Sequence, residues 1–151
     1  MKKTILTILS AIIAISSISV FDAKADGGLD ILERVMETVE LLEDADYSLA
    51  CVMIDQLTSS SDTRTLTRHL YAGNEYMAIA EGDTRIKDTD LTIYKKLGEE
   101  WVVVDHDSDT SNVAVVSFDC TETGDYKFEV SAYSFADGHS VALYGLTIAF
   151  D

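Results

Sequence analysis

The sequence predicts a mainly β protein, an antiparallel β-sandwich of about seven to eight strands with a short N-terminal helix. Three observations support this prediction. From residue 63 onward, apolar and polar residues alternate in short runs, which is the period of a β-strand. Turns rich in Gly, Asp and Ser separate these runs. A helical period occurs near the start of the chain and not between the runs, so the alternating strands and helices of a parallel sheet are not expected.

Residues 1–25 have the composition of a signal peptide. A positive start, Met1-Lys2-Lys3, precedes an apolar run from Thr4 to Val20, and Ala23-Lys24-Ala25 forms the small-x-small pattern that signal peptidase cleaves. We expect cleavage before Asp26 and export to the periplasm or the extracellular space. The alternative is an uncleaved membrane anchor, for which the apolar run is slightly short and too rich in serine.

The segment after the signal is predicted to form a helical leader and loop, residues 26–62, packed as one domain with a β-sandwich at 63–151. Residues 30–43 have a helical period, and Asp30 and Glu33 have the spacing of a capping box. The predicted apolar face of this helix consists of Leu32, Val35, Met36, Val39 and Leu42. Residues 44–56 fit either a helix or a strand.

Seven strands are predicted after the leader. They are Thr65–Tyr71, Glu75–Glu81, Leu91–Leu97, Trp101–Asp105, Asn112–Asp119, Tyr126–Ser134 and Val141–Phe150. The alternation is cleanest between residues 126 and 132, where Tyr126, Phe128, Val130 and Ala132 share one face and Lys127, Glu129 and Ser131 share the other.

Acidic residues dominate the charge. The chain has 27 Asp and Glu against 11 Lys and Arg, which gives a formal net charge of −16. Such a surface repels phosphate backbones and anionic lipid headgroups. The charge therefore excludes nucleic acid as a partner, and we expect no membrane insertion once the signal is removed.

The chain has two cysteines, Cys51 and Cys120. Export would place them in an oxidising compartment, where a single pair favours a disulfide. The alternative is two buried free thiols. A catalytic or metal-binding thiol is less expected, because neither residue lies in a Cys-x-x-Cys pair and the close neighbours of Cys120 are acidic.

Clustered carboxylates make calcium the expected cofactor. Glu81, Asp83, Asp88 and Asp90 surround one connection between strands, and oxygen-rich clusters suit this hard cation. The alternative is that these are ordinary turn residues, since Asp favours turns by bonding its own backbone.

A second, weaker acidic loop contains Asp105, Asp107 and Asp109 at alternate positions. It is not an EF-hand, because Thr110 occupies the glycine position and Val116 the position of the bidentate Glu. A solvated hairpin loop is the better interpretation.

Aromatic residues offer a possible ligand platform. Tyr94, Trp101 and Tyr133, together with Tyr144, could present rings to a sugar or a collagen-like chain. The alternative is core packing. The sequence contains neither a His-Glu-x-x-His zinc motif nor a Gly-x-Ser-x-Gly elbow.

Three segments carry short motifs in the order found in a known family. They are Leu70–Tyr76, similar to the pattern L-x-A-G-x-x-Y, Asp88–Tyr94, similar to D-x-D-L-x-L-Y, and Thr123–Val130, similar to T-G-x-Y-x-v-x-V. They resemble the bacterial pre-peptidase C-terminal domain, over about residues 65–150. The resemblance implies a jelly-roll-like sandwich that is usually a non-catalytic appendage of exported enzymes. Some members bind calcium, which points to Asp88 and Asp90, and some bind collagen.

The chain contains no catalytic domain beside this region, so we interpret it as a standalone exported version of the family. The leading hypothesis is a non-catalytic binding or adhesion module, stabilised by calcium, for an exported protein or polysaccharide partner. The alternative is a periplasmic partner or inhibitor protein that docks through its N-terminal helix. A third, weaker hypothesis is a small hydrolase with an acidic site. The signature of such a site would be two carboxylates of different pKa in one cleft.

Overall fold

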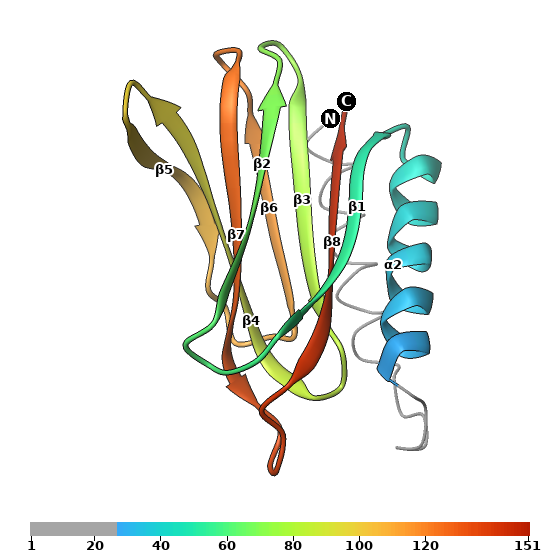
Figure 1. Ribbon diagram of the computed structural model, residues 1–151. Coiled ribbons are helices and arrows are strands. Elements are labelled where there is room, and N and C mark those ends of the chain that lie inside the picture. The colour runs from blue at the N-terminus through green and yellow to red at the C-terminus, as the bar shows by residue number, and fades with distance from the viewer. Residues whose placement is uncertain (1–26) are drawn as a thin grey trace.

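Two antiparallel four-stranded sheets face each other, and a helix lies along one flank (Figure 1). This computed structural model describes residues 27–151. The predicted signal peptide, residues 1–25, and its cleavage before Asp26 lie outside the described residues. The prediction of a mainly β sandwich with an N-terminal helix is confirmed.

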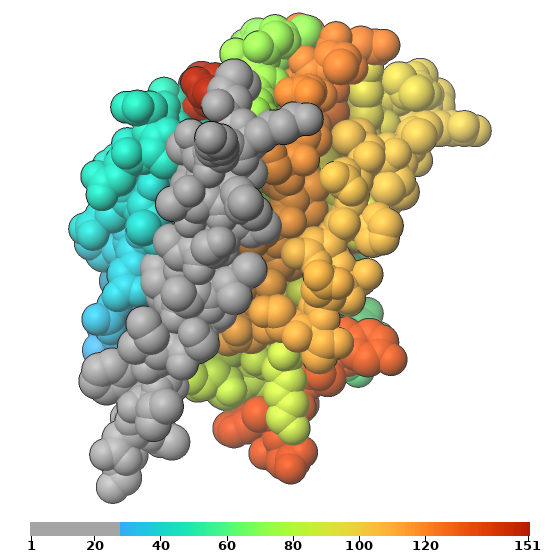
Figure 2. Space-filling model, turned by 180° about the vertical axis from the view of Figure 1, so that it is seen from behind, coloured from blue at the N-terminus to red at the C-terminus, as the bar shows by residue number. Residues whose placement is uncertain are grey.

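The first and last strands of the described chain are neighbours, as they are in jelly-roll folds. Sheet A has the order β1-β8-β3-β6 and sheet B the order β2-β7-β4-β5. The elements are α2 (Gly27–Asp44), β1 (Ser48–Leu57), β2 (Thr63–Leu70), β3 (Glu75–Gly82), β4 (Ile86–Leu97), β5 (Glu100–Asp107), β6 (Val113–Asp119), β7 (Gly124–Phe135) and β8 (Ala142–Phe150). Seen from behind, α2 and β5 lie on opposite flanks (Figure 2).

The segment that the sequence left open is a strand. Residues 48–57 form β1, which pairs antiparallel with β8 from Ser48–Phe150 to Leu57–Ala142. The sandwich therefore begins before the predicted boundary at residue 63, and the leader is not wholly helix and loop. Local sequence could not decide this, because the partner strand lies at the other end of the chain.

The helix is rotated from the predicted orientation. Ile31, Val35 and Leu42 are buried against the sheet, whereas Leu32 and Met36 are 43% and 55% exposed. The cause is Gly145 in β8, where an added Cβ would overlap the side chain of Val35. A glycine at this position lets the helix approach the sheet backbone closely.

The predicted cap at Asp30 is also wrong. The helix already includes Gly27, so Asp30 lies inside its first turn. There the carboxylate accepts a hydrogen bond from Arg34 Nε at 3.4 Å, one turn further along. This is the i, i+4 pairing of neighbouring charges on one helix face.

The core between the sheets follows the predicted alternation. The side chains of Tyr126, Phe128, Val130 and Ala132 are all buried. Aromatic rings fill the end of the core where β3 begins, and the ring centroids of Tyr76 and Phe118 lie 6.0 Å apart. Burial on this scale is the main stabilising contribution to a domain of this size.

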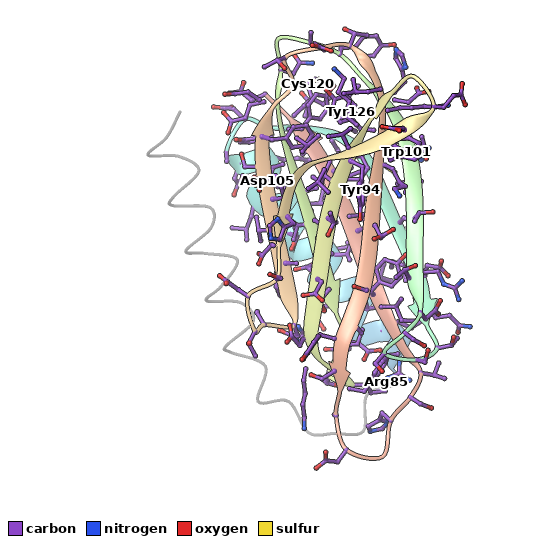
Figure 3. The ribbon with its side chains drawn as sticks, turned by 90° about the vertical axis from the view of Figure 1, so that its left-hand side faces the viewer. Arg85, Tyr94, Trp101, Asp105, Cys120 and Tyr126 are labelled. Carbon is purple, nitrogen blue, oxygen red and sulfur yellow. The ribbon has the colours of Figure 1, made fainter. Side chains whose placement is uncertain are left out.

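The predicted disulfide between Cys51 and Cys120 is wrong, because both cysteines are free. Cys51 lies in β1, at one edge of sheet A, and Cys120 follows β6, at the other edge. With β8 and β3 between them, they are separated by about 14 Å of sheet width, and a disulfide needs Cα atoms within about 7 Å. The Cys120 thiol instead lies 3.4 Å from the Glu122 carbonyl oxygen and 3.5 Å from the Tyr126 hydroxyl, at one end of the sandwich (Figure 3).

A buried carboxyl group joins the helix to sheet A. Glu81 in β3 is 3% exposed, and its Oε1 accepts a hydrogen bond from Thr38 Oγ1 at 2.7 Å. Its other oxygen has no hydrogen-bond partner. Burial raises the pKa of Glu81 from 4.5 to about 7, although the Thr38 hydrogen bond and the Arg34 charge oppose the shift. The native state therefore holds this proton more tightly than the unfolded chain does.

We expect the Glu81→Gln variant to lose a pH dependence that the wild-type protein has. Because the native pKa is the higher one, the contribution of Glu81 to stability is complete below pH 4.5 and is lost as the pH rises toward about 7. Glutamine keeps the acceptor for Thr38 but does not ionise. Urea unfolding at about pH 5 and about pH 8 should show the variant gaining on wild type by roughly 2 kcal/mol at the higher pH. The exposed Glu40→Gln variant should keep the wild-type slope, and an unchanged slope in Glu81→Gln would contradict the assignment.

Candidate functional site

The two outer faces of the sandwich differ. Helix α2 packs on β8, β1 and β3, which all belong to sheet A. No helix in residues 27–151 packs on the outer face of sheet B. No described helix therefore covers this second face, which leaves it available to a ligand.

The register of sheet B determines which side chains share that face. Tyr94 in β4 is opposite Lys127 in β7, which is opposite Thr67 in β2, and Lys96 is opposite Trp101 in β5. Alternation along each strand then gives the rest of the outward set. The set combines hydroxyl groups, carboxylates, amines, imidazoles and aromatic rings: Thr63, Thr65, Thr67, His69, Asp90, Thr92, Tyr94, Lys96, Trp101, Val103, His106, Asp125, Lys127, Glu129, Ser131 and Tyr133.

Four of these residues form what we call the aromatic–lysine cluster: Tyr94, Trp101, Lys127 and Glu129. Lys127 Nζ lies 4.0 Å from the centroid of the Tyr94 ring and 5.5 Å from that of Trp101. The Tyr94 hydroxyl donates to Glu129 Oε1 at 3.0 Å, and Lys127 Nζ lies 3.7 Å from Glu129 Oε2. Burial raises the pKa of Tyr94, and the hydrogen bond and charge of Glu129 raise it further. Both rings are thus held in place before any ligand arrives.

The predicted platform is only partly brought together. Tyr94 and Trp101 belong to neighbouring strands and share Lys127 (Figure 3). Tyr133 is 74% exposed but lies farther along β7, roughly 20 Å from Lys127 at the rise of a strand. Tyr144 is fully buried in the core. The sequence pointed Lys127 and Glu129 outward but could not show that they meet Tyr94, because the β4–β7 register decides it.

The four residues proposed for calcium lie in different surroundings. Glu81 is on the outer side of sheet A, facing Thr38 of the helix. Asp83 is fully buried and is ion-paired with Arg85. Its oxygens also accept backbone N–H groups from Arg85 and Leu143, each at 2.8 Å. Asp83 therefore anchors the start of β8 with its oxygens already in use.

Asp88 and Asp90 remain close to each other and to the second acidic loop. Asp88 is 6% exposed, and its Oδ1 has no hydrogen-bond partner. Burial raises the pKa of Asp90, and the charges of Asp88 and Asp107 add to the effect. Between residues 27 and 151, no three His, Cys, Asp or Glu side chains are grouped so that they could hold a metal ion. Calcium binding stays a prediction.

The second acidic loop is held by its own backbone. Asp107 accepts N–H groups from Asp109 at 2.9 Å and from Val115 at 2.8 Å, and Asp105 accepts the N–H of His106 at 2.8 Å. The bond to Val115 links β5 to β6 and so ties the two sheets together along this side. These contacts favour a structural role for the loop.

A histidine–carboxylate pair also lies on the open face. His69 Nδ1 is 2.9 Å from Asp125 Oδ1, but both side chains are about half exposed. In the described part of the chain, no hydrogen bond joins a histidine to a serine, threonine or cysteine side chain. A surface ion pair of this kind has little effect on stability.

Comparisons with known proteins identify similar folds. No protein-family model and no curated protein matches the chain. Among solved structures, it is similar to Aeromonas hydrophila PliG, a periplasmic inhibitor of g-type lysozyme, with 11% identity, a TM-score of 0.49, and coverage of 67% of this chain and 85% of that one. It is also similar to the pre-peptidase C-terminal domain of a Bacillus anthracis collagenase, with 14% identity, a TM-score of 0.49, and coverage of 66% and 89%. The family that the sequence motifs resemble is thus among the similar structures.

A third similar structure is the Yersinia pseudotuberculosis-derived mitogen, with 11% identity, a TM-score of 0.49, and coverage of 68% of this chain and 85% of that one. At sequence identities this low, the similarity to these three structures is a similarity of fold alone. Within the described residues, no helix combines the length and the apolar character that crossing a membrane requires.

We expect calcium to raise the melting temperature of the wild-type protein in a saturable way. An ion that binds only the native state stabilises it by mass action, and the unpartnered oxygen of Asp88 offers a ligand. The Asp88→Asn variant should lose the rise, and Asp137→Asn, at a fully exposed position, should keep it. Melting curves that coincide in EGTA and in calcium would contradict the prediction.

Proposed function

We propose that this protein is an exported, non-catalytic binding module that holds a neutral or cationic polysaccharide on the outer face of sheet B. The observation that carries the proposal is the aromatic–lysine cluster on a face that no described helix covers. Export rests on the signal peptide predicted from the sequence.

The chemistry of the face favours a hydroxylated ligand. Tyr94 and Trp101 offer apolar ring edges and faces against which the C–H surfaces of a sugar can pack. Elsewhere on the same face, threonine hydroxyl groups can donate or accept, and Asp90 and Asp125 can accept from sugar hydroxyl groups. A sheet face is extended and shallow, which suits several consecutive units of a chain better than one small molecule.

The charge selects among polysaccharides. The formal net charge of −16 repels polyanions over the whole surface. Within the cluster, Lys127 is paired with Glu129 and so offers no unpaired positive charge to an anionic sugar. A neutral or cationic chain is therefore the favoured ligand.

A non-catalytic role fits the same residues. Glycoside hydrolysis needs two free carboxyl groups on opposite sides of the scissile bond. Glu129, the carboxylate nearest the rings, is already engaged by the Tyr94 hydroxyl and Lys127. Asp90 is partly buried beside Asp88 and Asp107, away from the rings by the register of β4.

We expect the Trp101→Ala and Tyr94→Ala variants to lose polysaccharide binding. Removing one stacking ring from such a site should weaken binding at least about tenfold, because aromatic contacts dominate interfaces of this kind. Affinity electrophoresis in gels containing soluble neutral and cationic polysaccharides measures the change. Tyr133→Ala is the matched control, since Tyr133 is exposed on the same strand as Lys127 but far from the cluster. Retardation of the Trp101→Ala and Tyr94→Ala variants equal to that of wild type would rule out the aromatic–lysine cluster as the binding site.

A second candidate function is docking to a protein through helix α2. Leu29, Leu32 and Met36 are 68%, 43% and 55% exposed. Their spacing of three and four residues places them along one side of the helix. An exposed apolar stripe on an otherwise acidic protein is a feature of partner-binding surfaces.

We expect Met36→Glu to weaken the binding of such a partner by at least about tenfold. The fold should stay intact, because the side chain of Met36 already faces solvent. Pull-down from an extract of exported proteins compares it with wild type. Glu40→Ala, on the same exposed helix, is the control. Identical partners and amounts for Met36→Glu and wild type would exclude the stripe as a docking surface.

A further inference from the structure

Side chains alone join the two sheets along the side where β1 and β2 lie, as in the hydrogen bond from Arg64 Nε to the Gln56 carbonyl oxygen at 2.9 Å. These strands follow each other in the chain, but β1 pairs with β8 and β2 with β7, so each is an edge strand of a different sheet. The opposite side is tied by the hydrogen bond from Val115 to Asp107. A cavity of about 280 Å³ lies on the side of β1 and β2, lined by residues of β1, β2, β3 and β8 and of the β2–β3 turn.

The lining of the cavity is mostly apolar and includes one arginine. Ile148, Phe150 and the ring of Tyr76 supply apolar walls, and Arg68 and Asn74 supply polar side chains. The ring of His69, also in the lining, pairs with Asp125 on the outer face of sheet B. The chain has 27 acidic residues, yet none of those within residues 27–151 lines this cavity. The composition of the lining therefore contrasts with the charge of the whole protein.

Arg68 is the unusual residue of this lining. Its Nη2 lies 3.2 Å from the sulfur of Cys51, which is a weak acceptor. The other arginines of the described chain, Arg34, Arg64 and Arg85, each pair with a carboxylate. Arg68 has no carboxylate partner within residues 27–151, so most of its N–H donors are available to a ligand.

Tyr76 supplies a second donor in the wall. Its hydroxyl oxygen accepts the backbone N–H of Tyr71 at 3.2 Å and the side-chain amide of Asn74 at 3.5 Å. No hydrogen bond of the described residues uses the hydroxyl proton of Tyr76. The residue is 3% exposed, so an acceptor for that proton would have to lie in the cavity.

We propose that this cavity binds a carboxylate that carries one aromatic or branched apolar group, either as a free small acid or as the C-terminal residue of a chain. The carboxylate would pair with the Arg68 guanidinium and accept the Tyr76 proton, and the apolar group would lie against Ile148 and Phe150. The size is adequate, because a dry cavity of about 150 Å³ in another protein holds benzene.

The same features exclude other ligand classes. A cation would face Arg68 without a carboxylate to balance it. A multiply charged, strongly hydrated anion would have to shed water against the apolar walls. Charge-assisted bonds from a guanidinium to a carboxylate are the strong pairing that this lining offers.

The test uses phenylacetate and its neutral counterpart phenylacetamide as probes, with two-dimensional amide NMR of the protein. We expect phenylacetate to shift the amides of β1, β2 and β8 around the cavity and to bind at least about tenfold more tightly than phenylacetamide. Equal binding of the two probes, or no shift of these amides up to about 20 mM phenylacetate, overturns the proposal.

A matched pair of variants tests the role of Arg68. Arg68→Gln should weaken phenylacetate binding by about ten- to a hundredfold, because a charged hydrogen-bond donor is lost. Arg64→Gln, on the same strand and already paired with Asp62, should bind as wild type does. The same spectra report whether each variant is folded. Unchanged affinity in Arg68→Gln overturns the assignment.

The peptide Gly-Gly-Phe, with a free or an amidated C-terminus, distinguishes the two sources of the carboxylate. Tighter binding of the free peptide than of phenylacetate supports a chain end, and binding of phenylacetate alone supports a small acid. The amidated peptide binding as well as the free one would contradict both. The cavity and the outer face of sheet B share no residue of the aromatic–lysine cluster, so either site can fail without the other.

Discussion

The close packing of helix α2 against β8 at Gly145 constrains the rest of the structure. Because that position has no Cβ, the side chain of Val35 reaches the sheet backbone, and this fixes the rotation of the helix. The rotation buries Ile31 and Leu42, brings Thr38 onto Glu81, and leaves Leu32 and Met36 in solvent. It also assigns the helix to sheet A, so sheet B carries the open face. The absence of a side chain at Gly145 thus allows the helix to pack closely on sheet A, while no described helix covers sheet B.

Polar groups with unused hydrogen-bonding capacity occur at the proposed calcium site and at the cavity. The unpartnered oxygen of Asp88 lies near Asp90 and Asp107, and Arg68 and Tyr76 line the cavity on the side of β1 and β2. Asp83, by contrast, is fully buried but satisfied by Arg85 and by backbone N–H groups, and it works as an anchor for β8. Burial of a charge is therefore not by itself a sign of function here. What distinguishes the functional candidates is a hydrogen-bonding group left free toward a surface that a ligand can reach.

Sequence patterns predicted the strands better than the contacts between them. The alternation from Tyr126 to Ala132 placed four side chains in the core correctly, because a half-buried strand needs a period of two. The helix was located correctly, but its buried face was not, since Leu32 and Met36 fit the helical period as well as Ile31 does. The disulfide was inferred from composition and compartment, and it failed because Cys51 and Cys120 are at opposite edges of one sheet. Tyr94 and Trp101 were recognised as aromatic candidates, whereas Lys127 and Glu129 were not linked to them.

By itself the sequence determined the class of fold, the acidic surface and most strand positions, because periodicity, turn residues and net charge are local or additive properties. Only the tertiary structure decided that residues 48–57 are a strand, that Gly145 admits the helix, and that Arg68 lacks a carboxylate at an apolar cavity. Each of these depends on partners distant in the chain: β8 for β1, Val35 for Gly145, and Tyr76 and Phe150 for Arg68. Such pairings are set by strand register and sheet order, and single-sequence patterns do not encode them within any one segment.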